Sequence, residues 1–365
     1  MAVPTPVVVE SPKVVPTKTL KWSRESLEAG VMSPIPQRPT NYPDLSGLNV
    51  LEDGHGQIRN FDLLVTTAGN FNVFLNFIMT QRVLQMYPSI NNGSWYYTTS
   101  PPVAGQQIPN ARMTFGNVQF NGVPSVAMGP NGHLNGLISN GWNEGSAVSL
   151  LSNFGNVLMV KKGNPKNINS VWDLKRSSVK VGTSNPIEAG SFGNYSSSIH
   201  NIAFWDVYNQ TGDVDDALEA ADDLFDTVFN KKDNATSNNP KWFVGERIMH
   251  RHSPQLLADG VVDVVPLFYH LAQTAVNRTE LGSQLFDIVP LGGTVASPDP
   301  LLGNRVGTMR ALKINQATGG FSPAQLQNRD DFFDTITDVA GNAAYFAPSW
   351  VREPVTTGNN QPDLP

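Results

Sequence analysis

The stretch Gly155–Pro186, GNVLMVKKGNPKNINSVWDLKRSSVKVGTSNP, contains two expected strands with a turn and a short helix between them. The uninterrupted apolar run Val157–Val160 predicts a buried strand, and Gly163–Pro165 predicts the turn that follows it. Trp172 and Leu174 have the spacing of a short amphipathic helix, and Val179–Gly182 predicts the second strand. The order strand, turn, helix, strand is typical of an α/β protein.

This order resembles the passage into the second lobe of the type II periplasmic solute-binding proteins, in particular the molybdate- and tungstate-type proteins of ABC importers. In those proteins a strand ending in K-G-N-P precedes a W-D-L or A-D-L helix and a strand ending in N-P. A second match is 253–268, which reads as a helix, a glycine stop at Gly260 and a strand. The resemblance implies an α/β fold with two lobes, each a mostly parallel sheet flanked by helices. It also implies that the chain captures a small ligand and is not an enzyme.

Composition limits the other classes of function. The chain has 365 residues, 40% of them apolar, which is ample for a large core. Its net charge of −6 provides no basic field, so we expect no nucleic-acid partner. The absence of cysteine excludes disulfides, thiolate chemistry and cysteine-based metal clusters.

The two ends of the sequence are expected to lie outside the folded lobes. Residues 1–60 form a proline-rich N-terminal arm, because eight prolines between 4 and 43 forbid long helices and central strands. Residues 351–365 form a polar tail. Neither a signal peptide nor an apolar run of about 18 residues is visible, so a periplasmic or extracellular location rests on the resemblance.

The remaining residues divide into two expected lobes. Lobe 1 combines 61–156 with 311–350, and lobe 2 is 162–303, with hinge crossings at 157–161 and 304–310. Lobe 1 opens with a strand at 61–67 that leads into a helix, and the same order recurs at 123–138. In lobe 2, 253–260 predicts a capped helix and 261–268 a buried strand.

Ligands of open α/β sheets bind beyond the carboxyl ends of the strands, where turns lead into helices. Such turns place free backbone N–H groups and the positive end of a helix around the ligand, which suits a small anion. We therefore expect the ligand in the cleft between the lobes, at four turns and one strand end: Thr67, Ala68, Gly69 and Asn70; Met128, Gly129 and Pro130; Ala189 and Gly190; His250, Arg251, His252 and Ser253; and Phe268 with Tyr269.

The resemblance supports these positions unevenly. Molybdate-type proteins carry a small hydroxyl residue in the first turn, where this chain has Ala68-Gly69-Asn70, so Thr67 or the Asn70 amide would have to replace it. The family's small residue before a glycine matches Ala189-Gly190. Its aromatic hydroxyl aligns with Phe268, with Tyr269 shifted by one residue. The resemblance is therefore specific for the fold and weak for the ligand.

Two alternatives stay open. The same fold binding an organic carboxylate or a lipid-like molecule would explain the missing hydroxyls. A metal site would combine His250 and His252 with His133, His200 or His270, although no metal-binding motif accompanies them. We do not expect an enzyme, because nucleophile-elbow and phosphate-loop motifs are both absent. We expect no cofactor, a small oxyanion as the ligand, an ABC importer permease as the partner, and a monomer.

Overall fold

The chain folds into two α/β units, which confirms the predicted fold class. The computed structural model describes residues 54–55, 61–67, 72–98, 112–115, 118–184, 189–229, 241–244, 249–277 and 282–342. The continuous unit is Asn153–Val306, and the discontinuous unit combines Leu51–Ser152 with Gly307–Gly358. Of the expected N-terminal arm the structure describes Gly54–His55, and the tail 351–365 lies outside the described residues.

The discontinuous unit is built on a six-stranded sheet in the order β1-β3-β2-β6-β13-β7. Its strands are β1 (Gly54–His55), β2 (Leu63–Thr66), β3 (Trp95–Thr98), β6 (Val126–Gly129), β7 (Asn143–Ser152) and β13 (Thr308–Ile314), beside a hairpin of β4 (Arg112–Phe115) and β5 (Val118–Asn121). Its helices are α2 (Asn72–Ile78), α3 (Leu84–Met86), α4 (Pro88–Asn91), α5 (Asn131–Ser139), α11 (Gln316–Gly319) and α12 (Pro323–Thr337), with a π-helical turn η4 (Met79–Val83).

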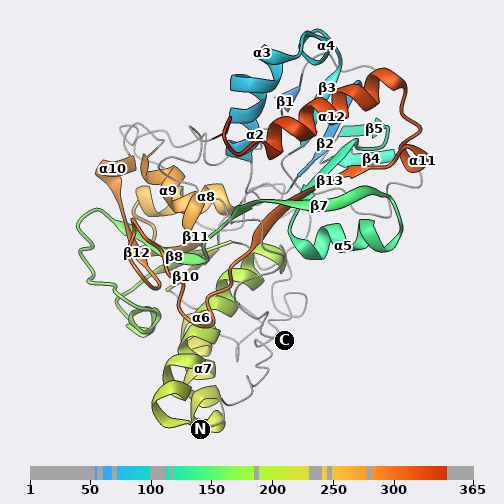
Figure 1. Ribbon diagram of the computed structural model, residues 1–365. Helices are drawn as coiled ribbons and strands as arrows, with labels where there is room; N and C mark the ends of the chain where they lie inside the picture. The colour runs from blue at the N-terminus through green and yellow to red at the C-terminus, as the bar shows by residue number, and fades with distance from the viewer. Residues whose placement is uncertain are drawn as a thin grey trace. The chain divides into compact units, whose positions relative to one another are not determined.

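Alternating side chains of this sheet face two separate cores. Leu63 and Val65 of β2 pack with α2, η4 and α12 on one face (Figure 1). Leu64 lies on the opposite face, in the core that includes Leu134 and Leu137 of α5. The strand period of two residues explains this division, because successive side chains point to opposite faces. Both faces of the sheet are therefore covered, as expected for an α/β unit.

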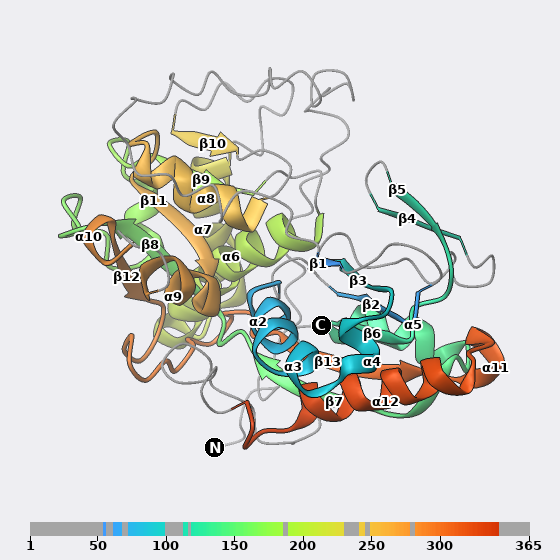
Figure 2. The same cartoon turned by 90° about the horizontal axis from the view of Figure 1, so that it is seen from above.

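The continuous unit has a five-stranded sheet in the order β10-β9-β11-β8-β12. Its strands are β8 (Asn156–Lys161), β9 (Val181–Thr183), β10 (Trp242–Val244), β11 (Val264–Phe268) and β12 (Phe286–Pro290). Its helices are α6 (Ala189–Thr211), α7 (Val214–Phe229), α8 (Met249–Ala258), α9 (Tyr269–Asn277) and α10 (Gly282–Leu285), with a 3₁₀ turn η6 (Val171–Lys175). Helices α6 and α7 pack on one face and α8 and α9 on the other (Figure 2).

The stretch Gly155–Pro186 supplies β8, η6 and β9, so its predicted order is confirmed. The short helix is 3₁₀ and starts with a capping box, in which Ser170 and Asp173 satisfy each other's backbone N–H groups. Leu174 is buried in the core, while Nε1 of Trp172 donates to Asp206 of α6 at 2.7 Å. The W-D-L motif therefore anchors the connection between β8 and β9 to the longest helix of the unit.

The sheets are mixed, which corrects the expectation of mostly parallel sheets. Strand β2 runs parallel to β3 and β6, but β13 is antiparallel to both β6 and β7. In the continuous unit β9 runs parallel to β10 and β11, whereas β8 is antiparallel to β11 and β12. Parallel neighbours need a long crossover connection. The strands β7, β8 and β13 lie next to the two passages of the chain between the units, so they are not parts of local strand-helix-strand repeats.

The first passage between the units lies just before β8. The chain divides between Ser152 and Asn153 and again between Val306 and Gly307, and β8, which spans the expected crossing 157–161, belongs to the continuous unit. The Asn304 side chain accepts a hydrogen bond from Asn156 N and donates to Asn156 O, both at 2.8 Å. Gly155 has φ +73, and a Cβ there would lie 2.9 Å from Asn304. Glycine is required at this position by both conformation and space.

Candidate ligand-binding site

Three parallel strands of the continuous unit end at one edge and lead into helices. Strands β9, β10 and β11 have the same direction, and α6, α8 and α9 follow them in the chain. The predicted Ala189 and Gly190 are the first two residues of α6. The amino ends of these helices carry unpaired N–H groups and partial positive charge, so this edge suits an anion.

Ser184 is the residue at this edge that sequence reasoning missed. It follows β9 directly and is 0% exposed, and its Oγ has no hydrogen-bond partner among the residues that the structure describes. The neighbouring Thr183 hydroxyl is occupied, because it accepts from Trp242 Nε1 at 2.8 Å and donates to Ser184 O at 3.0 Å. A buried polar group without a partner is costly. Ser184 therefore offers a free donor and acceptor at the end of a central strand.

Phe268 and Tyr269 lie where β11 meets α9. The Phe268 ring stacks on His270 with centroids 5.7 Å apart and packs against Tyr195 at 5.0 Å. The Tyr269 hydroxyl donates to Val295 O at 2.7 Å and accepts from Gln273 Nε2 at 3.1 Å. Burial raises the pKa of this hydroxyl. Tyr269 thus uses its only donor inside the unit, and its hydroxyl stays protonated at neutral pH.

His250, Arg251, His252 and Ser253 lie within α8 and not in the turn before it, which corrects the predicted helix start. The helix begins at Met249 and contains Pro254. Proline fixes φ near the helical value, so its cost is the loss of one N–H donor and a steric clash with the carbonyl four residues earlier. The prediction from the sequence put Pro254 at the first helical position, where that cost is absent. Ser253 is fully buried, and the side chains of 250–252 lie outside the described part.

The discontinuous unit has a corresponding edge at the ends of β2 and β6. Thr67 follows β2 and is fully buried, while Ala68, Gly69 and Asn70 lie outside the described residues. Met128 and Gly129 are the last residues of β6, and Pro130 is the N-cap of α5. The N-cap residue Pro130 makes no side-chain hydrogen bond to the first N–H groups of this helix.

His133 is a second residue that the predicted site did not include. It lies in the first turn of α5, and a Cβ on Gly129 would be 2.9 Å from its Cδ2 atom. Its Nε2 atom is buried and has no hydrogen-bond partner within the described ranges, and burial lowers the pKa of the imidazole. The ring is therefore neutral at pH 7, and Nε2 is available as a donor or an acceptor according to the tautomer. The sequence signal was its position three residues after Pro130, the last residue of a predicted strand-to-helix turn.

The alternative of a histidine metal site gains no support from the described residues. Among them, no group of three or more His, Asp or Glu side chains could hold a metal ion. His200 contacts Asp222 and Asn201, with Nε2 and Nδ1 at 3.1 and 3.2 Å from their oxygens. His250 and His252, the centre of that alternative, have no described side chains.

No helix in the described part is long and apolar enough to cross a membrane.

Comparison with known proteins identifies the family. The profile of the bacterial extracellular solute-binding proteins matches residues 123–323, more than half of the chain. No curated protein matches the chain.

Similar solved structures include three proteins with TM-scores of 0.45 to 0.48. The sulfate-binding protein SubI of Mycobacterium tuberculosis is 15% identical, with 80% of this chain and 86% of that chain covered and a TM-score of 0.48. Peb3 of Campylobacter jejuni is 12% identical and the periplasmic molybdate-binding protein of Azotobacter vinelandii 14%, each with 80% of this chain and 100% of that chain covered and a TM-score of 0.45. On the evidence of the family profile, the chain belongs to the bacterial extracellular solute-binding proteins.

Proposed function

We propose that this protein captures a small oxyanion, of the molybdate, tungstate, sulfate or phosphate type, outside the cytoplasmic membrane and delivers it to an ABC importer permease. The observation that carries the proposal is the fully buried Ser184 Oγ, which lies between the end of β9 and the start of α6 and has no hydrogen-bond partner in the described part of the chain. Family membership supports the transport role. The name of the sulfate-binding neighbour agrees with an oxyanion but does not identify the ligand.

The charge of the whole protein is no obstacle to this ligand. Although the net charge is −6, the ligand would meet backbone N–H groups and a hydroxyl donor at the edge of the sheet. A five-atom oxyanion at the ceiling of about 1.5 kcal/mol per atom gains about 7.5 kcal/mol, which corresponds to low-micromolar affinity. We therefore propose that a preorganised set of neutral donors binds the oxyanion without a cationic side chain.

Capture and release need no bond-making chemistry. We accordingly propose a monomeric carrier that uses no cofactor and works in the periplasm or the extracellular space. The proposal uses Ser184 and the amino ends of α6, α8 and α9. It does not need the Tyr269 hydroxyl, which already donates to Val295 O.

Calorimetric titration of the whole chain tests the ligand class. Sulfate, phosphate, molybdate and tungstate are titrated separately into protein dialysed against chloride buffer, with benzoate as the probe for an organic carboxylate. We expect at least one oxyanion to bind with micromolar affinity and to raise the melting temperature. If none of the four releases heat or shifts the melting temperature, the oxyanion proposal is wrong, and binding of benzoate alone would favour the organic alternative.

A further inference from the structure

The discontinuous unit contains a cavity at the opposite end of its sheet from the edge described above. The cavity has a volume of about 180 Å³ and is lined by Phe61, Asp62, Val123, Ser125, Phe321 and Gln325, among others. Phe61 and Asp62 immediately precede β2, and Val123 and Ser125 precede β6. The lining therefore lies at the amino ends of these parallel strands. This position separates the cavity from Thr67 and His133, which lie at or beyond the carboxyl ends.

The neutral polar groups of the lining are already satisfied within the unit. Ser125 Oγ accepts from Leu64 N at 3.2 Å and donates to Leu64 O at 3.0 Å. Gln325 donates to Phe61 O at 2.6 Å and accepts from Ser322 N at 2.8 Å. Neither side chain needs a ligand to complete its hydrogen bonds. These bonds fix the shape of the cavity.

Asp62 is different, because its carboxylate keeps unused acceptor capacity. Its Oδ2 accepts one hydrogen bond from Ser94 N at 2.8 Å. No ion pair to Asp62 occurs among the residues that the structure describes. An ionised carboxylate can accept about four hydrogen bonds. Among the described residues, the Asp62 carboxylate in the cavity lining therefore has no cationic partner.

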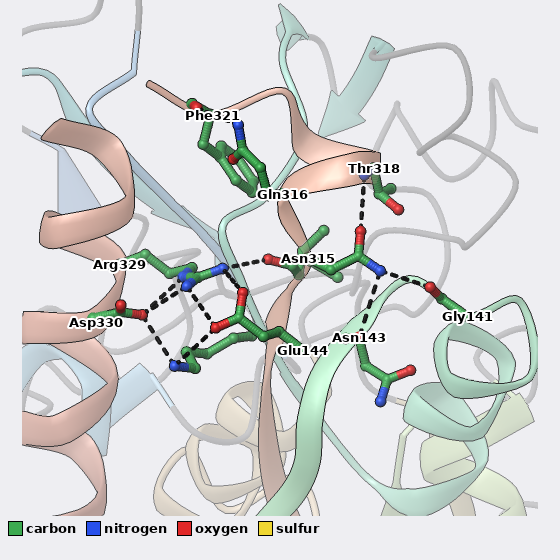
Figure 3. A network of polar contacts seen from close by, with 11 residues as sticks. Gly141, Asn143, Glu144, Asn315, Gln316, Thr318, Phe321, Arg329 and Asp330 are labelled. Carbon is green, nitrogen blue, oxygen red and sulfur yellow. Dashed lines mark hydrogen bonds and ion pairs between the residues drawn. The ribbon is translucent and has the colours of Figure 1, made fainter. Parts of the chain in front are cut away.

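Two aromatic rings complete the lining. The Phe61 ring lies 6.1 Å from that of Tyr96, and Phe321 is buried in the adjoining core. Figure 3 shows Phe321 next to the capped turn of α11: Asn315 accepts from Thr318 N at 2.8 Å, and Gln316 donates to Phe321 O at 2.7 Å. A Cβ on Gly319 would lie 2.0 Å from the Phe321 ring. The ring is held directly against this backbone.

A carboxylate and aromatic rings that line the same cavity are a combination that recognises organic cations. Ammonium groups gain from charge-assisted hydrogen bonds to carboxylates and from the negative faces of aromatic rings. An apolar protein cavity of about 150 Å³ holds one benzene molecule, so a cavity of about 180 Å³ admits one ring with a short amine. We propose that this cavity is a second ligand site, for a small primary ammonium compound with a single ring or a comparable apolar group.

Ligand-observed NMR titration of the whole chain with benzylammonium tests this site, with benzyl alcohol as the neutral probe of equal size. In Asp62→Asn the amide oxygen can still accept from Ser94 N, so the fold is preserved. We expect this variant to weaken benzylammonium binding by at least about tenfold and to change benzyl alcohol binding less than about twofold. Asp334→Asn, an exposed carboxylate of the same unit, is the matched control and should leave both affinities unchanged.

A second variant shows whether binding occurs in the cavity. Val123→Phe fills the space and should abolish binding of both probes while the oxyanion affinity is retained. The proposal is overturned if wild-type protein does not bind benzylammonium, or if Asp62→Asn binds it as tightly as wild type. It is equally overturned if a folded Val123→Phe protein still binds it. Should that variant not fold, the comparison of Asp62→Asn with Asp334→Asn decides the question alone.

Discussion

Ser184 and His133 share one property at the scale of single residues. Each carries a buried polar atom that lacks a hydrogen-bond partner among the described residues, and each lies at or just beyond the carboxyl end of a parallel strand. The sequence predicted the turns around them but not these side chains, because burial of an atom depends on packing between distant segments. A serine between a strand and an N-P turn was visible at Ser184. Ser184 differs from Thr183 because the Trp242 indole donates a hydrogen bond to the Thr183 hydroxyl and not to the Ser184 hydroxyl.

The neutral state of His133 leads to a prediction about pH. Because burial lowers its pKa from 6.5, the unfolded chain binds a proton at a higher pH than the folded chain does. The free energy of unfolding should therefore fall as the pH drops from 6.5 to the folded pKa, by at most about 1.4 kcal/mol per pH unit. An NMR titration of the imidazole, assigned by comparison with His133→Gln, should give a midpoint below 6.5. A midpoint above 6.5 would contradict this prediction and would show that a negatively charged group faces the ring.

At the scale of elements, strand and helix patterns were predicted well and their boundaries less well. The buried runs at 157–160 and 261–268 became β8 and β11 because uninterrupted apolar residues fit a central strand. The start of α8 was misplaced, since Ser253-Pro254 also reads as a cap followed by a first-turn proline. Antiparallel pairing of β13 with β6 and β7 had no local signal. Strand direction in a sheet follows from the path of the whole chain.

A charged network holds α12 against β7 and β13 (Figure 3). Arg329 donates to both carboxylate oxygens of Glu144 at 2.7 and 2.9 Å and to Ile314 O at 2.8 Å. The Arg329 side chain is only 3% exposed, and Lys313 also lies 3.3 Å from Glu144. Hydrogen bonds from Arg329 and then Lys313 hold the pKa of Glu144 below its usual range. The network therefore stabilises the unit when Glu144 is ionised.

Glu144→Gln should lower the free energy of unfolding at pH 7 by about 1 kcal/mol, a value reduced because Glu144 is 42% exposed. For wild type, this contribution is complete above pH 4.5 and is lost as the pH falls through the lowered folded pKa. Urea unfolding monitored by circular dichroism at pH 7 and pH 3 measures both effects. Glu219→Gln removes an exposed carboxylate of α7. This control should change neither the free energy of unfolding at pH 7 nor its loss at pH 3. Equal losses in the two variants would remove the stabilising role of the network.

At the scale of the whole molecule, two units and a family were accessible from the sequence, whereas the ligand was not. The order of elements in Gly155–Pro186 indicated the family that the profile match to residues 123–323 confirms. Ligand identity depends on a few donor atoms, and several of the expected ones, at 68–70 and 250–252, lie outside the described side chains. The hinge crossings at 157–161 and 304–310 and closure around the ligand stay predictions.

Calorimetric comparison of wild type with Ser184→Ala, using the oxyanion that binds wild type most tightly, tests the central claim most directly. A hydrogen bond to a charged ligand contributes about 1.5–3 kcal/mol, so we predict an affinity about tenfold to a hundredfold weaker in the variant. Ser196→Ala is the matched control, because this buried hydroxyl donates only to Phe192 O within α6, and its affinity should equal that of wild type. An unchanged affinity in folded Ser184→Ala protein would contradict the assignment of the oxyanion to the end of β9.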